Sequence, residues 1–200
     1  MASGLWLLCF LYVLSTTEAA YKVMRCELRD ARPAARFLCN VFLREGMIDD
    51  IRGNLDRHID ETEEELLKHF SYDGVNGFRC AMYKATIGSE FCGFAEVFTD
   101  NSSPRLATIR NLSVDAKFRR RGLGSILVEH VCNTVSLEWN SDSADPSPKQ
   151  FTHIFLNVED DNEAAQQFYA ALGFERRADA SEEDSNFGGF GSSMWAKRLL

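Results

Sequence analysis

A glycine-containing turn in the middle of the chain joins a strand pattern to a helix pattern. The strand pattern covers residues 106–114, the turn has the sequence RRRGLGS at 119–125, and the helix pattern covers 122–137. An apolar stripe recurs along the helix at the spacing of one helical face, formed by Leu123, Ile126, Leu127, Val131 and Val135. A sheet and an amphipathic helix each need an apolar partner, so this segment predicts a layered α/β fold.

Further strand and helix patterns surround this unit. Strands are predicted at 23–28, 78–83, 91–98, 154–158 and 194–199, and helices after Pro33 and at 162–172. Residues 140–149 and 178–193 have the composition of loops. Because 200 residues make little more than one domain of ~150 residues, we expect one α/β domain with a mixed, mostly antiparallel central sheet flanked by helices.

The first twenty residues have a different character. Residues 5–14 form an apolar run of ten, which is too short for the ~20 residues of a membrane-spanning helix but suits a signal peptide. No Lys or Arg precedes this run. We expect a signal or targeting segment at 1–20, a folded domain at 21–200 and no stable membrane span, with the secretory pathway, an organelle and the cytoplasm as alternative destinations.

The charge distribution narrows the choice of partner. With 22 basic and 30 acidic residues the net charge is −8, which argues against nucleic acid as a partner. Residues 49–65 hold eight acids and two arginines and so carry −6 of that charge. This segment is either a solvated helix face or loop, or an acidic rim for a cationic substrate. The six cysteines form no C-x-x-C pair, and we expect them to be buried apolar side chains without a metal.

The turn at 119–125 has the chemistry of an anion site. Its two glycines allow a ligand to approach the backbone, and the N–H groups at a helix start carry partial positive charge, which suits phosphate. Arg119, Arg120 and Arg121 add charge that the acidic chain otherwise lacks. A P-loop is excluded because no Gly-Lys-Ser/Thr is present, and a dinucleotide fingerprint is excluded because Leu127 stands where it requires glycine.

Two motifs, in this order, resemble those of the GNAT superfamily of acyl-CoA-dependent N-acetyltransferases. Arg119-x-x-Gly122-x-Gly124 is similar to the family's pyrophosphate loop, Gln/Arg-x-x-Gly-x-Gly/Ala. Some forty residues later, Asn162-x-x-Ala165-x-x-x-Tyr169-x-x-x-Gly173-Phe174 is similar to its second signature. The resemblance covers about residues 22–200 and implies the GNAT fold.

The resemblance also implies an acetyl-CoA site between the strands that end near Val114 and Val158. Backbone groups of Leu112 and Val114, on either side of Ser113, would pair with the pantetheine arm as an added strand does. Asn162 would contact the pantetheine, and Tyr169 would direct its hydroxyl at the thioester sulfur. The pyrophosphate turn comprises Arg119, Arg120, Arg121, Gly122, Leu123, Gly124 and Ser125.

The expected chemistry is direct attack of a neutral amine on the acetyl thioester, with an N–H of strand 112–114 stabilising the oxyanion and Tyr169 protonating the thiolate. Many family members carry a glutamate base on the strands that here have no glutamate at 108–111 and 155–157. Glu96 is the best remaining carboxylate, with Glu159 behind it, and either could act through a water. Glu96 could equally be an acid on the strand surface. The histidines, at 58, 69, 130 and 153, form no triad or ligand pattern, and we expect them to be structural or on the surface.

Two functions follow from these residues. The first is an N-acetyltransferase that uses acetyl-CoA and no metal to modify a primary amine, either a protein N-terminus, a lysine or a small amine. The acidic segment favours a cationic acceptor. The alternative is a non-catalytic acyl-CoA-binding or sensing module that has kept the fold and lost its base.

Overall fold

The computed structural model describes residues 21–44, 46, 54–75, 78–99, 106–140, 151–177 and 191–199. The predicted targeting segment at 1–20 lies outside the described residues, as do most of the loops predicted at 140–149 and 178–193. Within the described ranges, no helix has the length and apolar character needed to cross a membrane.

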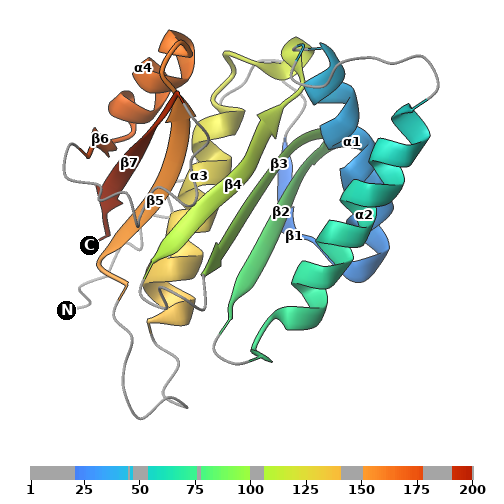
Figure 1. The fold of residues 1–200 in the computed structure, drawn as a ribbon, viewed down its shortest axis with the longest axis horizontal. Helices are drawn as coiled ribbons and strands as arrows, with labels where there is room; N and C mark the ends of the chain where they lie inside the picture. The colour runs from blue at the N-terminus through green and yellow to red at the C-terminus, as the bar shows by residue number, and fades with distance from the viewer. Residues whose placement is uncertain are drawn as a thin grey trace, which may run out of the picture.

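A seven-stranded sheet forms the centre of the molecule, in the order β1-β2-β3-β4-β5-β7-β6 (Figure 1). Neighbouring strands are antiparallel except β4 and β5, which run parallel. This arrangement confirms the mixed, mostly antiparallel sheet predicted from the sequence. The strands are β1 (Lys22–Arg25), β2 (Cys80–Ile87), β3 (Glu90–Thr99), β4 (Ala107–Val114), β5 (His153–Glu159), β6 (Glu175–Arg176) and β7 (Ser192–Arg198).

Helices cover both faces of this sheet (Figure 1). On one face, α1 (Ala31–Arg44) and α2 (Leu55–Tyr72) share a buried apolar cluster with Met82, Phe94 and Phe98. On the other face, α3 (Leu123–Asn133) continues into a π-helical turn at Thr134–Trp139. The last helix, α4 (Glu163–Ala171), packs against the same apolar cluster as α3.

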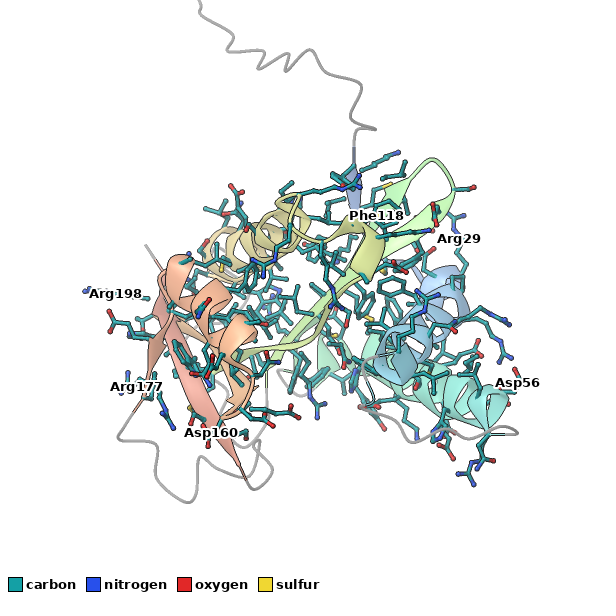
Figure 2. All side chains as sticks on the ribbon, turned by 90° about the horizontal axis from the view of Figure 1, so that it is seen from above. Arg29, Asp56, Phe118, Asp160, Arg177 and Arg198 are labelled. Atoms are coloured by element: carbon teal, nitrogen blue, oxygen red, sulfur yellow. The ribbon has the colours of Figure 1, made fainter. Side chains whose placement is uncertain are left out.

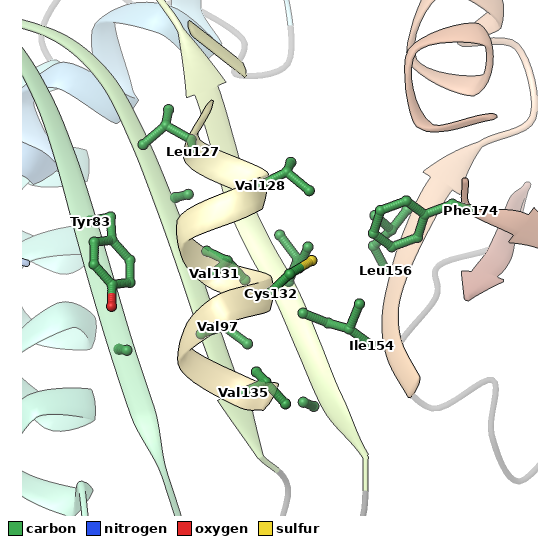
Figure 3. Packing of buried hydrophobic residues seen from close by; sticks show 14 of the residues in the cluster. Tyr83, Val97, Leu127, Val128, Val131, Cys132, Val135, Ile154, Leu156 and Phe174 are labelled. Atoms are coloured by element: carbon green, nitrogen blue, oxygen red, sulfur yellow. The ribbon is translucent and has the colours of Figure 1, made fainter. Parts of the chain in front are cut away.

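The apolar stripe predicted for α3 forms the centre of its cluster (Figure 3). Leu127, Val131 and Val135 have no exposed surface. A Cβ added at Gly93 would lie 3.0 Å from Leu127 Cδ1, so the glycine allows α3 to lie close to β3. This packing fixes the helix, and therefore its N-terminus, beside the end of β4.

The structure corrects or extends several of the predictions made from the sequence. The described part of the acidic segment is the beginning of α2, which corresponds to the solvated helix face and not to the loop. Strand β6 was not predicted because two residues are too few to show a periodicity, and β7 begins at Ser192, two residues earlier than expected. All five described cysteines are buried and free, as predicted.

Candidate active site

The parallel strands β4 and β5 meet over only two residue pairs. Ala107 pairs with Ile154 and Thr108 with Phe155, and beyond these pairs the register ends. Seen from above, Phe118, just after β4, and Asp160, just after β5, lie far apart (Figure 2). The two strands therefore diverge toward their C-terminal ends, as the predicted acetyl-CoA site requires.

On the edge of β4 that faces this divergence, the N–H groups of Leu112 and Val114 have no strand partner among the described residues. The N–H of Asp115 donates to the carbonyl of Cys92 on β3, at 3.1 Å. Because successive residues of a strand point their polar groups to opposite sides, Ser113 also faces β3, whereas Leu112 and Val114 face away from it. The pairing of Leu112 and Val114 with pantetheine stays a prediction, while Ser113 is buried and lies on the β3 side.

The glycine turn leads from β4 to the N-terminus of α3, with residues 119–122 exposed and Leu123 buried. Arg120 and Gly122 adopt left-handed conformations, with φ of 61° and 80°. Gly122 is the N-cap and has no side chain to cap the helix, so the amides of the first turn are available to a ligand. Arg119 braces the turn through a hydrogen bond from its Nε to the Val114 carbonyl, at 2.9 Å.

Helix α4 supplies the second half of the predicted site. Its apolar face, formed by Ala165, Phe168, Tyr169 and Leu172, is only partly buried. A Cβ added at Gly124 would lie 3.1 Å from Phe168 Cζ, so the second glycine of the turn lets α4 approach α3. Asn162 is the N-cap of α4, and its Oδ1 accepts a hydrogen bond from the Ala165 N–H at 3.0 Å. Its contact with pantetheine stays a prediction.

Tyr169 packs edge-on between two aromatic rings. Its centroid lies 5.1 Å from that of Phe168 and 5.5 Å from that of Phe174. Burial raises the pKa of Tyr169 above its ordinary value, so the phenol stays protonated at neutral pH. Its hydroxyl makes no hydrogen bond within the described residues, which leaves the proton available to a ligand.

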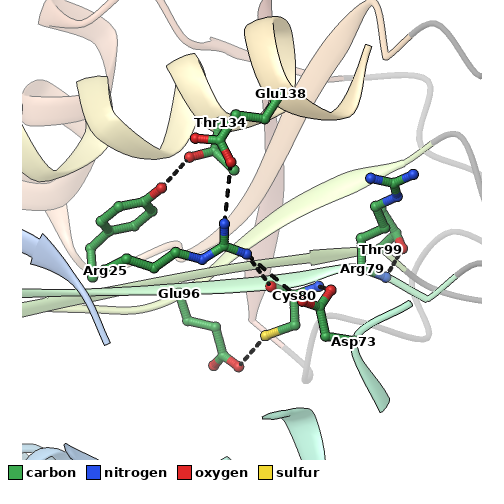
Figure 4. Close-up of polar contacts among 9 residues, drawn as sticks. Arg25, Asp73, Arg79, Cys80, Glu96, Thr99, Thr134 and Glu138 are labelled. Atoms are coloured by element: carbon green, nitrogen blue, oxygen red, sulfur yellow. Dashed lines mark hydrogen bonds and ion pairs between the residues drawn. The ribbon is translucent and has the colours of Figure 1, made fainter. Parts of the chain in front are cut away.

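Glu96 lies on the opposite face of the sheet from Tyr169 and is completely buried. The prediction of a surface acid is therefore wrong, because this carboxylate has polar partners that the sequence did not reveal. His69 Nδ1 lies 2.5 Å from Oε1, and Asn111 Nδ2 donates to Oε2 at 3.0 Å. The Cys80 thiol lies 3.6 Å from Oε1, the contact drawn in Figure 4. By contrast, Glu159, at the end of β5, is exposed.

A β-bulge places Asn111 against this carboxylate. Phe94 pairs with Ser113 and Glu96 with Arg110, so β4 contains one extra residue between these pairs. Asn111 has a φ of 52°, in the left-handed region that asparagine tolerates better than most residues. The bulge thus ties Glu96 to the part of β4 that lies next to Leu112.

The comparisons with known proteins agree with this geometry. The model of the acetyltransferase (GNAT) family matches residues 47–174, which is more than half of the chain. This protein belongs to the GNAT family of acetyltransferases. The family match confirms the resemblance drawn from the two motifs.

Individual relatives of this GNAT protein are distant. It is 30% identical over 106 residues to the [ribosomal protein bS18]-alanine N-acetyltransferase of Salmonella typhimurium, a match that covers 52% of this chain and 61% of the relative. Two solved structures each match 90% of the chain. They are a GNAT acetyltransferase from Staphylococcus aureus Mu50 (TM-score 0.63, 18% identity, 100% of that chain) and the PaiA N-acetyltransferase of Thermoplasma acidophilum in complex with coenzyme A (TM-score 0.62, 15% identity, 99% of that chain).

One group of side chains in this GNAT protein has the donor types of a metal site. His69, Cys80 and Glu96 each place one such atom within 4.8 Å of the others. The Nδ1–Oε1 distance of 2.5 Å is that of a hydrogen bond, whereas a tetrahedral zinc ion would hold these atoms about 3.3 Å apart. Burial and the charge of Glu96 raise the pKa of the Cys80 thiol, which disfavours the thiolate that a metal needs. The group is therefore a hydrogen-bonded cluster in this structure.

His69 is the site residue that the sequence reasoning missed. It lies on α2, while Glu96 lies on β3, so no local spacing connects them. The available signal was Glu96 itself, a single acid within an apolar run at 91–98. A buried carboxylate needs hydrogen-bond donors, and such a run predicts that they come from elsewhere in the chain.

The acidic segment is largely neutralised where it is described. Asp60 and Glu63 both contact Arg32, at 2.5 and 2.6 Å. The neighbouring acids also have cationic partners: Glu61 with Arg57, Glu64 with Lys68, and Glu65 with Arg110. This part of α2 therefore offers little unpaired negative charge, and a preference for cationic acceptors stays a prediction.

Proposed function

We propose that this protein transfers an acetyl group from acetyl-CoA to a primary amine by direct attack, and that a protein N-terminus is the best first acceptor to test. The observation that carries the proposal is the divergence of β4 and β5, with the open strand edge and the exposed helix N-terminus on the same side of the gap. The bacterial relative acts on the alanine of ribosomal protein bS18, according to its name.

The cofactor fits this gap in two parts. The pantetheine arm carries amide groups, which can pair with the open N–H of Leu112 and Val114 as a neighbouring strand would. The pyrophosphate fits the exposed amides between Arg119 and Ser125, where the helix N-terminus favours negative charge. The acetyl group would then lie beside the β4 bulge.

The chemistry needs a neutral amine, a stabilised oxyanion and a proton for the leaving thiolate. An N–H on the open edge of β4 can donate to the oxyanion. Tyr169 can donate the last proton, because a phenol is protonated at neutral pH and its hydroxyl makes no hydrogen bond among the described residues. An α-amine, with a pKa near 8, is easier to neutralise than a lysine, with a pKa of about 10.4, which supports a protein N-terminus as acceptor.

The test is a thiol-release assay with acetyl-CoA and a panel of amines that begins with a peptide bearing an N-terminal alanine. We expect Tyr169→Phe to lower kcat by ~10²-fold or more while CoA affinity changes little. Tyr72→Phe is the matched control, because Tyr72 is exposed on α2. If CoA binds but no amine gives Tyr169-dependent release, the protein is instead a non-catalytic acyl-CoA-binding module.

A further inference from the structure

Glu96 cannot meet the acceptor amine directly in the structure described here. Its side chain has no exposed surface, and both of its oxygens already accept hydrogen bonds. An ammonium group that reached it would have to displace His69 or Asn111 and enter a cluster shared with Phe94 and Phe98. The Glu96 carboxylate therefore positions the side chains around it, and one of these side chains would have to contact the acceptor amine.

His69 is the titratable neighbour of Glu96 that reaches solvent, since Cys80 is buried. Its side chain is 14% exposed, its Nδ1 faces Glu96, and its ring stacks on Phe98 with centroids 6.2 Å apart. Arg110, beside the bulge on β4, lies over the same Phe98 ring at 5.0 Å. The imidazole is thus held by Glu96 on one side and by an aromatic ring on its face, next to the strand that binds the cofactor.

We infer that His69 takes a proton from the acceptor ammonium at its Nε2 and that Glu96 is the positioning residue that orients the ring. The inference rests on the proposed function. The ammonium loses one proton to His69, which passes it to solvent, and the free amine then attacks the acetyl carbonyl. As the tetrahedral intermediate collapses, the C–S bond breaks and Tyr169 protonates the leaving thiolate. The nitrogen then loses its second proton to solvent, and solvent returns a proton to the Tyr169 phenolate. The products are the amide, CoA thiol and one released proton.

The charges around the ring favour this role. The hydrogen bond to Glu96 raises the pKa of His69, and burial opposes the shift only in part. Glu65 on α2 raises it further, Arg110 on β4 lowers it, and Cys80 on β2 stays a neutral thiol. A raised pKa brings the imidazole closer to that of an α-amine, which makes proton transfer between them easier.

The test compares His69→Gln with wild type on two acceptors, a peptide with an N-terminal alanine and an arylamine that is neutral near pH 7. We expect kcat/KM for the peptide to fall ~10-fold at pH 7, because only about a tenth of an α-amine with a pKa near 8 is neutral at that pH. The value for the arylamine should change less than ~3-fold, because only the peptide must lose a proton first. In His69→Gln, the rising limb of the plot of kcat/KM against pH for the peptide should also shift to higher pH, to the pKa of the amine itself, near 8. His58→Gln, on the same helix and beside Glu61, is the control and should change neither.

The outcomes separate this inference from the proposed function. If wild type acetylates neither amine, the proposed function fails. If His69→Gln lowers both acceptors equally and leaves the pH profile in place, His69 is structural and the inference is overturned. Should this variant not fold, Glu96→Gln replaces it: loss of the carboxylate charge lowers the pKa of His69, so the rising limb must move to lower pH, and an unmoved limb overturns the inference.

Discussion

The bulge at Asn111 offers a quantitative test of how the buried cluster is held. Asn111→Gly keeps the left-handed backbone but removes the hydrogen bond to the Glu96 carboxylate, which costs about 1.5–3 kcal/mol of unfolding free energy for a bond to a charged group. Asn111→Ala loses the same bond and keeps a Cβ in the left-handed region, whereas glycine is relieved of that Cβ, which is worth about 1–2 kcal/mol. Alanine should therefore destabilise by about 1.5–3 kcal/mol, and glycine by about 1–2 kcal/mol less than alanine.

Urea unfolding followed by circular dichroism measures both variants. Gly88→Ala is the matched control, because Gly88 has a φ of 58° in the turn between β2 and β3 and a Cβ there would meet no atom within 4 Å. Its cost, about 1–2 kcal/mol, should equal the difference between the two Asn111 variants. Equal stability of the two variants would refute the left-handed bulge, and a neutral Asn111→Ala would refute the bond to Glu96.

Two further predictions concern the turn and a buried ion pair. Replacing Arg120 and Arg121 by Ala should weaken CoA binding at least ~10-fold in calorimetry, because charge-assisted bonds to phosphate are lost. Arg36→Ala on α1 is the control and should leave CoA affinity unchanged. Unchanged CoA affinity in the Arg120 and Arg121 variant would mean that the turn is not the pyrophosphate site. Burial alone would raise the pKa of Asp30. The hydrogen bonds from Lys84 Nζ at 2.5 Å and from the Glu27 N–H at 2.9 Å, together with the charges of Lys84 and Arg29, outweigh burial and lower the pKa. The stabilisation of the folded state by the Asp30 carboxylate is therefore present above the unfolded pKa of about 3.9 and is lost as pH falls through the folded pKa. The difference in unfolding free energy between wild type and Asp30→Asn should therefore disappear below about pH 4.

The parts of the fold that the sequence predicted are those with a long, regular pattern. The stripe from Leu123 to Val135 repeats over several turns and has one low-energy solution, which is burial against the sheet. The turn at 119–125 was also predictable from its glycine content. Gly122 can adopt the positive φ required at the helix start, and it has no side chain to cap the first amides. The position of Tyr169 on the inner face of α4 followed from the same helical spacing.

The cluster around Glu96 could not be predicted in the same way. Its members come from α2, β2, β3 and β4, and their meeting depends on a single inserted residue in β4. Without the bulge at Asn111, the residues beyond it would point to the other face of the sheet. Such a one-residue shift has no periodic signature, and α2 itself was predicted only as an acidic segment whose pattern gave no reason to single out His69.

In the proposed mechanism the two proton transfers occur on opposite faces of the sheet. His69 and Glu96 lie in the cluster beneath α1 and α2, whereas Tyr169 packs with α3 on the other face of the sheet. A thioester held in the gap between β4 and β5 would be open to both faces, so an amine can approach from the α2 side while the sulfur faces the phenol. Each group can then have its pKa set independently. A neighbouring carboxylate raises that of the imidazole, and burial among aromatic rings raises that of the phenol. Under the proposed mechanism, the divergence of two parallel strands would supply both the binding edge for the cofactor and the separation between the group that accepts a proton and the group that donates one.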